Sequence, residues 1–422
     1  MENSMVFDEN GVSGEVNREI TPEKMARLGC VTADVIGKKI AVSTDAGSGS
    51  TMIKNAVISG LLSGGASALD FGEQPIPITR SGIKFYNLKG GLHISLDGGR
   101  VDILDSNGIN PASIHMKKIE TECNDGNVER AIPETIRDAV SLQSYKLYYI
   151  RDIVNSCRNE KLDFNILICV NNPTVKGIVI PLLRELGCKY TTYKNAKGEI
   201  TDGFASVVKK EGYDMGAYIG DDGEKLILCD GKGRILSQEL YDCLCAIIIF
   251  KHEIDRTYVV SVSAPSVIDN IAASYGGEII RTKMAENLIM SKVSELNREG
   301  LCAQFVLNFD PVGGLIKIMD FLKTENSKLE NIVDAIPKFY MAYGEVECGE
   351  DKREAIMNKL TEENKSKADI TDGVKIYENG GWTLISPQRG KNSFRIISEG
   401  MNTEMADELM VRYSDIIKKM NE

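Results

Sequence analysis

The chain has 422 residues, so at roughly 150 residues per domain it should hold about three domains, or about four small ones. Its 50 Lys and Arg residues against 61 Asp and Glu residues give a net charge of -11, and no long segment concentrates the basic residues. We therefore expect no nucleic-acid partner. Hydrophobic residues make up 42% and charged residues 26% of the chain, which excludes a disordered or fibrous protein.

The sequence also limits the cellular location. Residues 1–16 carry acidic side chains where a signal peptide would be basic, so we expect no secretion signal. The apolar stretch 246–250 is far shorter than the ~20 residues of a membrane span, so we expect no membrane partner. Ten scattered cysteines without a CxxC pair indicate reduced, cytoplasmic thiols. With only three histidines, a structural zinc site or a Ser-His-Asp triad is not expected.

The first part of the chain alternates strands with helices. Thr21 and Pro22 predict the start of a helix, and Gly64 and Gly65 predict the end of the next one. Asn107 and Gly108 supply turn residues for a hairpin. The expected order is helix 22–36, strand 38–45, helix 48–65, strand 68–72, strand 90–96 and hairpin 101–110.

Two further rounds of the same alternation follow. The second has strand 164–170, helix 173–186, strand 189–194, helix 203–212, strand 215–219 and hairpin 225–236. The third has strand 257–263, helix 264–275, strand 278–283, helix 285–297 and strand 303–309. Three α/β units in series are the simplest interpretation.

The C-terminal part has a different pattern. It predicts a hairpin over 373–387 with its turn at 378–381, a strand over 394–400 and an amphipathic helix over 402–419. The predicted fold class is α/β, with three similar mixed-sheet domains followed by an α+β domain. The predicted boundaries are 1–145, 146–250, 251–345 and 346–422.

Several local strings then point to one family. They are FDENGVSG at 7–14, the segment 54–78, IIRTKMAENLI at 279–289 and the segment 381–417. Their order resembles the α-D-phosphohexomutases, which include phosphoglucomutases, phosphomannomutases and phosphoglucosamine mutases. The resemblance covers the whole chain and implies four domains arranged around a central cleft. It also implies four loops that meet there: a phosphoserine loop, a three-Asp magnesium loop, a sugar-reading loop and a cationic phosphate loop.

The family's catalytic TASHNP motif falls on residues 95–100. Asp97 stands at the position of the phosphorylated serine, Gly98 and Gly99 replace the His and Asn, and Arg100 follows. The resemblance makes Asp97 the candidate catalytic residue and Arg100 a candidate phosphate-binding residue. A carboxylate can form an acyl phosphate, or its fixed charge can mimic phosphoserine. The alternative is a strand-end turn with a solvated aspartate.

The metal and sugar loops also differ from the family pattern. The magnesium loop falls on residues 220–225, where Asp222 is kept and Glu224 is a substitute. These two residues are the candidates for a weak Mg²⁺ site, and the alternative is an acidic turn before a hairpin. The sugar-reading motif, expected near 305–315, is missing there. Gly313 and Gly314 should instead begin a helix or make a tight turn.

The phosphate loop falls on residues 386–395. Its candidate substrate-binding residues are Arg389, Gly390, Lys391 and Arg395. A glycine among cations can hold an anion through charge and backbone N–H groups. The alternative is a solvated basic hairpin tip.

Two hypotheses remain open at this point. In the first, the chain is a pseudoenzyme that binds a phosphosugar, another anion or a protein partner. In the second, it is a divergent mutase or phosphatase that uses Asp97 as nucleophile, with Mg²⁺ held by Asp222 and Glu224. The first is favoured because phosphoryl transfer depends on positioned charge, and all four loops are altered.

Overall fold

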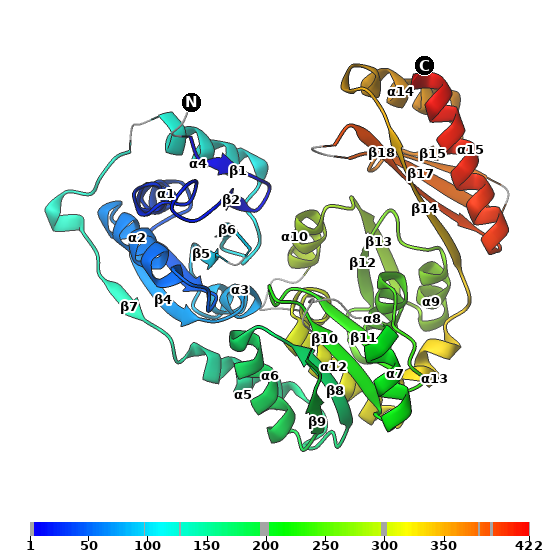
Figure 1. Ribbon diagram of the computed structural model, residues 1–422, viewed down its shortest axis with the longest axis horizontal. Helices are drawn as coiled ribbons and strands as arrows, with labels where there is room; N and C mark the ends of the chain where they lie inside the picture. Colours follow the sequence, from blue (N-terminus) through cyan, green and yellow to red (C-terminus); the bar gives the residue numbers. More distant parts are fainter. Residues whose placement is uncertain are drawn as a thin grey trace. The chain divides into compact units, whose positions relative to one another are not determined.

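A computed structural model describes residues 4–96, 98–125, 128–194, 202–296, 302–378, 380–388 and 391–421. The chain has an α/β fold and divides into two compact units (Figure 1). The first unit comprises Met1–Leu236 and Val293–Glu330, and the second comprises Ser237–Lys292 and Asn331–Glu422. Within the described residues, no helix combines the length and apolar character that a membrane span requires. The predicted α/β class with mixed sheets is confirmed, whereas the four domain boundaries stay a prediction.

A seven-stranded mixed sheet begins the first unit, with strand order β1-β2-β6-β5-β3-β4-β7. Strands β5, β3, β4 and β7 run parallel to one another, whereas β6 is antiparallel to β5. The strands are β1 (Val6–Phe7), β2 (Gly11–Ser13), β3 (Lys39–Thr44), β4 (Ser67–Glu73), β5 (Gly90–Ser95), β6 (Arg100–Asp105) and β7 (Ala139–Ser141). The predicted strands 38–45, 68–72 and 90–96 are confirmed.

Four helices belong to this part of the chain: α1 (Pro22–Val35), α2 (Ser50–Ser63), α3 (Ile76–Phe85) and α4 (Ser113–Asp125). Thr21 caps α1 by accepting a hydrogen bond from the Lys24 N–H, as its place before Pro22 predicts. Helices α1 and α2 cross very closely at Gly60, where a Cβ atom would lie 1.8 Å from the Ala26 carbonyl oxygen. The small residues of α2 therefore serve this crossing.

The predicted hairpin at 101–110 is wrong. Asn107 and Gly108 do form a turn, but the chain after them makes no second strand. The Asp105 carboxylate accepts hydrogen bonds from the Asn107 and Ile109 N–H groups, and Asn110 donates to the Ile103 carbonyl. These side-chain bonds take the place of a strand ladder. Strand β6 pairs instead with β5, so the hairpin lies one strand earlier.

A second sheet in the first unit has the order β11-β10-β8-β9. Its strands are β8 (Asn165–Val170), β9 (Lys189–Thr192), β10 (Met215–Ile219) and β11 (Leu226–Asp230). The helices of this region are α5 (Tyr145–Ser156), α6 (Pro173–Glu185) and α7 (Asp202–Glu211), and the 3-10 turn η1 is Pro133–Thr135. The predicted hairpin at 225–236 is reduced to β11 and one bridge between Cys229 and Ile235.

The predicted strand at 303–309 is also wrong, because this segment forms helix α11 (Ala303–Phe309). The Phe305 and Phe309 rings lie one helical turn apart and pack edge to face at 5.1 Å. Asp310 then ends α11 and caps α12 (Pro311–Thr324) through the Gly313 N–H. The short apolar segment has no period that separates strand from helix. Its tertiary surroundings decide instead: Phe305 is buried, and Lys84 of α3 lies over its ring at 5.9 Å.

The second unit contains two sheets. One pairs β12 (Thr257–Ser261) with β13 (Glu278–Thr282) in parallel, and the other has the antiparallel order β14-β18-β17-β16-β15. The five strands are β14 (Tyr340–Glu347), β15 (Ala368–Asp369), β16 (Val374–Glu378), β17 (Gly381–Pro387) and β18 (Ser393–Gly400). The predicted hairpin across 378–381 is confirmed by the β16–β17 pairing.

Four helices accompany these sheets: α8 (Gln238–His252), α9 (Val267–Tyr275), α14 (Glu350–Glu363) and α15 (Thr403–Asn421). Helix α15 lies along the five-stranded sheet (Figure 1). The unit boundaries after Lys292 and after Glu330 fall within helices α10 (Glu286–Leu296) and α13 (Leu329–Ala335). Trp382 and Glu399 hydrogen-bond to Ser266 and so join the two sheets of this unit.

Candidate functional site

Three charged residues from distant parts of the first unit meet in one cluster. Arg80 lies on α3, Arg100 is the first residue of β6, and Glu224 lies in the loop after β10. Arg80 Nη2 donates to Glu224 Oε1 at 2.7 Å, and Arg100 Nη2 donates to Glu224 Oε2 at 2.6 Å. Both oxygens of one carboxylate therefore bind a guanidinium group.

The cluster continues into the first sheet. Arg100 Nε donates to Asp102 Oδ2 at 2.9 Å, and Arg80 Nη1 donates to the Gly108 carbonyl at 3.2 Å. Burial alone would raise the pKa of Glu224, but the charges of Arg80 and Arg100 outweigh it and hold this pKa below its usual range. For Asp102 burial prevails over Arg100 and raises the pKa to about 6.

A buried histidine lies on β5 beside this cluster. His93 Nδ1 is 2.8 Å from Ser43 Oγ, which is 2.6 Å from Thr79 Oγ1. Burial lowers the pKa of His93 to about 4, so the ring is neutral at pH 7. With 2% of its surface exposed and its Nδ1 next to a hydroxyl, His93 connects strands and helix α3 within the core.

The predicted magnesium ligands do not fit an Mg²⁺ site. Asp222 Oδ1 accepts the Glu224 N–H at 2.9 Å, and both Glu224 oxygens are occupied by arginines. Mg²⁺ needs near-octahedral oxygen ligands. A metal ion beside Glu224 would also be repelled by the two guanidinium groups, because two like unit charges 4 Å apart repel by about 4 kcal/mol at an effective dielectric constant of 20. Within the part of the chain that the structure describes, no three His, Cys, Asp or Glu side chains gather as metal ligands would.

The loop that carries Glu224 is tightly seated. Gly223 has a φ of +72°, and a Cβ atom there would lie 2.8 Å from Pro75 Cβ and 3.1 Å from Val175 Cγ2. A side chain at this position would therefore be strained and crowded. Sequence reasoning named Glu224 but missed Arg80, because α3 has no local motif that marks an ion-pair partner 144 residues away.

The predicted catalytic residue Asp97 lies outside the described residues. Among the described residues beside it, the Gly99 N–H donates to the Leu96 carbonyl at 3.0 Å. Ser95 Oγ donates to Asp45 Oδ2 at 3.0 Å. Asp45 Oδ1 also accepts the Ser50 hydroxyl at 2.9 Å, so this aspartate orders the loop that leads into α2.

The region where the sugar-reading motif was expected is helical. Gly313 and Gly314 lie in the first turn of α12, which confirms their predicted role at a helix start. Both carboxylate oxygens of Asp310 accept the Tyr149 hydroxyl, at 2.8 and 2.7 Å. The polar groups of this segment therefore satisfy each other inside the first unit.

In the second unit, the predicted phosphate loop connects β17 to β18. Arg389 and Gly390 lie outside the described residues, whereas Lys391 and Arg395 are exposed. Glu345 on β14 faces both cations: it is the cross-strand partner of Arg395 and lies 3.8 Å from Lys391 Nζ. A 2.6 Å hydrogen bond from Ser393 Oγ, together with these cations, holds the pKa of Glu345 below its usual range.

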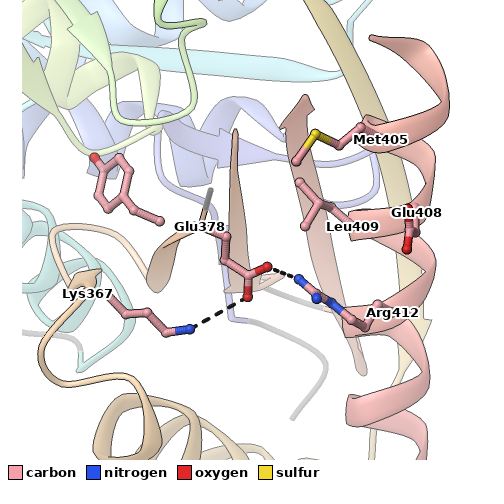
Figure 2. A pocket seen from close by; sticks show the side chains of 7 residues that line it. Lys367, Glu378, Met405, Glu408, Leu409 and Arg412 are labelled. Carbon is pink, nitrogen blue, oxygen red and sulfur yellow. Dashed lines mark hydrogen bonds and ion pairs between the residues drawn. The ribbon is translucent and has the colours of Figure 1, made fainter. Parts of the chain in front are cut away.

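A pocket of about 450 Å³ in the same unit lies between β16 and α15. Figure 2 shows the Glu378 carboxylate pointing toward Lys367 and Arg412. Tyr413 also donates to Glu378 at 2.6 Å, so the charge of Glu378 has three internal partners. Met405 and Leu409 supply an apolar wall.

Comparison with known proteins gives a consistent result. Residues 4–128 match the model of phosphoglucomutase/phosphomannomutase, alpha/beta/alpha domain I. The phosphoglucomutase/phosphomannomutase of Thermococcus kodakarensis is 25% identical over 441 residues, covering 96% of each chain.

Two solved structures share the fold. A phosphoglucomutase/phosphomannomutase family protein from Burkholderia thailandensis superimposes with a TM-score of 0.81 at 13% identity, covering 97% of this chain and 95% of its own. Aspergillus fumigatus N-acetylphosphoglucosamine mutase, in complex with GlcNAc-6P and magnesium, has a TM-score of 0.53 at 12% identity, covering 91% of this chain and 78% of its own. Over almost its whole length the chain is therefore similar to a phosphoglucomutase/phosphomannomutase, residues 4–128 match domain I of that family, and the solved structures share its fold.

Proposed function

We propose that this chain keeps the phosphohexomutase fold, lacks mutase activity and binds a phosphorylated sugar without converting it. Another anion or a protein partner is the alternative ligand. The observation that carries the proposal is the engagement of both Glu224 oxygens by Arg80 and Arg100. Among the described residues, none of the ten cysteines forms a disulfide, which supports the further proposal that the protein is cytoplasmic.

Phosphoryl transfer makes specific chemical demands on a site. The transferred group needs a nucleophile in line with it and positive charge on its oxygens, and in this family a magnesium ion supplies part of that charge. Here Asp97 replaces the serine nucleophile, and the metal loop is neutralised from within by two arginines. Loss of nucleophile and metal together should remove many orders of magnitude in rate.

Binding requires less than catalysis. Lys391 and Arg395 keep two cations at the position of the family's phosphate loop, and both are exposed. The Aspergillus relative, a mutase, was solved with GlcNAc-6P. A site that has lost its chemistry but kept cations at this loop is suited to recognise the phosphate of a similar ligand.

The test is phosphorus NMR of the purified protein with glucose, mannose and glucosamine 1-phosphates, each with its bisphosphate primer and Mg²⁺. We expect no conversion over hours, together with line broadening of at least one sugar phosphate. An Asp97→Asn variant is the matched control. Conversion by the natural protein that this variant loses would refute the proposal and support a divergent mutase or phosphatase that uses Asp97 as nucleophile.

Conversion that persists in the Asp97→Asn variant would also refute the loss of activity, while excluding Asp97 as the nucleophile. Absence of both conversion and broadening would point to a protein partner rather than a sugar phosphate. A thermal shift gives a second, independent readout, because a ligand that binds only the folded state raises its melting temperature.

A further inference from the structure

Arg80 and Arg100 lie around the Glu224 carboxylate in the way that a bound cation would. Two guanidinium groups reach the same carboxylate from different elements, one from α3 and one from β6. The exposed fractions of the side chains are 4% for Arg80, 26% for Arg100 and 21% for Glu224. The carboxylate is therefore held from two sides by fixed positive charge in a largely desolvated place.

The charges of this group also balance. The two arginines face two acids, Glu224 and Asp102, and Arg100 bonds to both. A closed set of two cations and two anions gives no electrostatic reason to bind a further ion, because any added cation would meet two guanidinium groups. Without the arginines, the carboxylates of Glu224 and Asp102 would lose these cationic partners.

We propose that Arg80 and Arg100 occupy the role of the divalent cation of this fold family, so that the loop 220–225 is fixed by the chain's own guanidinium groups and needs no metal. The inference rests on the proposed function only in taking this loop as the counterpart of the magnesium loop. In this inference, the conformation of the loop depends on the Arg80 and Arg100 side chains instead of on a bound metal ion.

The position of the loop supports this role. A loop held by a metal is disordered or displaced when the metal is absent, whereas this loop has internal fixings along its length. Asn172 Nδ2 donates to the Asp221 carbonyl at 2.6 Å, and Asp222 accepts the Glu224 N–H. Glu224 then connects the loop to the first sheet through Arg100.

The experiment removes the arginines and offers the metal alone. Thermal unfolding is measured with and without Mg²⁺, at matched ionic strength, for the natural protein and for the Arg80→Gln/Arg100→Gln variant. We expect the natural protein to show no shift with Mg²⁺. The double variant should melt at a lower temperature and recover part of the loss with Mg²⁺, because Glu224 has then lost both arginine partners.

The matched control is the same double variant with Glu224→Gln added, which should lose the response to Mg²⁺. The single Arg100→Gln variant gives the same comparison if the double variant does not fold, since Arg100 is the more exposed of the two arginines. Isothermal calorimetry should then show that the arginine variant binds Mg²⁺ at least tenfold more tightly than the natural protein does.

Two results would overturn the inference. One is a melting temperature of the natural protein that rises with Mg²⁺ beyond the ionic-strength control. The other is a folded arginine variant that responds to Mg²⁺ no more than its Glu224→Gln counterpart. Both readouts are independent of activity, so mutase turnover by the natural protein would refute the proposed function and leave this inference standing.

Discussion

Replacement of Lys375 by methionine should stabilise the second unit at neutral pH. The Lys375 side chain lies on β16, with 2% of its surface exposed. Its Nζ donates to the Val262 carbonyl at 2.7 Å and lies 3.7 Å from the centre of the Trp382 ring. The ammonium group is thus kept from water, and its partners are one carbonyl and two aromatic rings, Trp382 and, at 5.5 Å, Tyr377.

The size of the effect follows from the pKa. Burial, and then the charge of Arg281, lowers the pKa of Lys375 from 10.5 to about 8, although Glu399, Asp369 and Asp269 oppose this shift. The difference of about 2.5 pKa units corresponds to roughly 3 kcal/mol of unfavourable free energy for holding the charge in the folded state. The Lys375→Met variant loses the bond to Val262 and the cation–π contacts, which together offset roughly 2 kcal/mol. A net gain of about 1 kcal/mol at pH 7 is expected.

The pH dependence has a definite sign. Because the folded pKa lies below the unfolded one, the unfolded state binds more protons between pH 8 and 10.5, and the stability of the natural protein rises with pH across that window. Below pH 8 both states carry the charge and the penalty is constant. In the Lys375→Met variant, this rise should be absent.

The assay is urea unfolding followed by the fluorescence of Trp382, the only tryptophan, which belongs to the second unit. Comparing the natural protein with Lys375→Met at each pH cancels the titration of other groups. Equal pH slopes in the two proteins, or a variant less stable by more than 1–2 kcal/mol at pH 7, would show that Lys375 is not a buried ammonium under strain.

Three further changes test other parts of the structure. Glu224→Gln should lower the stability of the first unit by about 3 kcal/mol, because it removes the carboxylate that pairs with the buried Arg80 and leaves Arg100 with Asp102 alone. Asp222→Asn should lower it by less than about 1 kcal/mol, and hydrogen exchange of peptides from the first unit measures both. Glu345→Gln should tighten inorganic phosphate binding several-fold by freeing Lys391, measured by calorimetry, and unchanged affinity would count against a phosphate loop there. Gly60→Ala should lower the free energy of unfolding by about 2 kcal/mol or more, because α1 and α2 cannot separate without loss of packing. Thermal unfolding measures this change, and an unchanged stability would contradict the close crossing.

Local signals in the sequence predicted part of the fold. The Thr21–Pro22 pair marked the start of α1, and Gly64 marked the end of α2, because capping chemistry acts within a few residues. A failure came where distant contacts decide. Segment 303–309 is rich in strand-forming residues, yet it forms a helix in which Phe305 is buried beneath Lys84 of α3.

The site was predicted less completely than the fold. Family resemblance located the loop 220–225 and the cations Lys391 and Arg395, but not the groups that neutralise them. Arg80 lies 144 positions before Glu224. Glu345 lies on β14 and meets Lys391 and Arg395 only because β14 pairs with β18. No pattern of a single sequence connects residues so far apart, because an ion pair of this kind depends on how separate sheets and helices pack.

The two charged loops have a common feature that bears on function. In the first unit Glu224 is matched by Arg80 and Arg100, and in the second unit Lys391 has Glu345 as its partner. A site that transfers a phosphoryl group needs charge that is positioned but not already compensated, because the substrate and the metal must supply the opposite sign.

The ion pairs that compensate these two loops differ in how deeply they are buried. Glu224 is held by short bonds to largely buried arginines, so displacing them would leave charges unpaired in a desolvated place. The Lys391–Glu345 pair is longer and solvent-exposed, so an incoming phosphate can compete with Glu345 at little cost. This asymmetry supports the proposed function, in which the protein binds a phosphate without transferring it: the proposed metal loop would be closed to ions, and an anion could still enter the proposed phosphate loop.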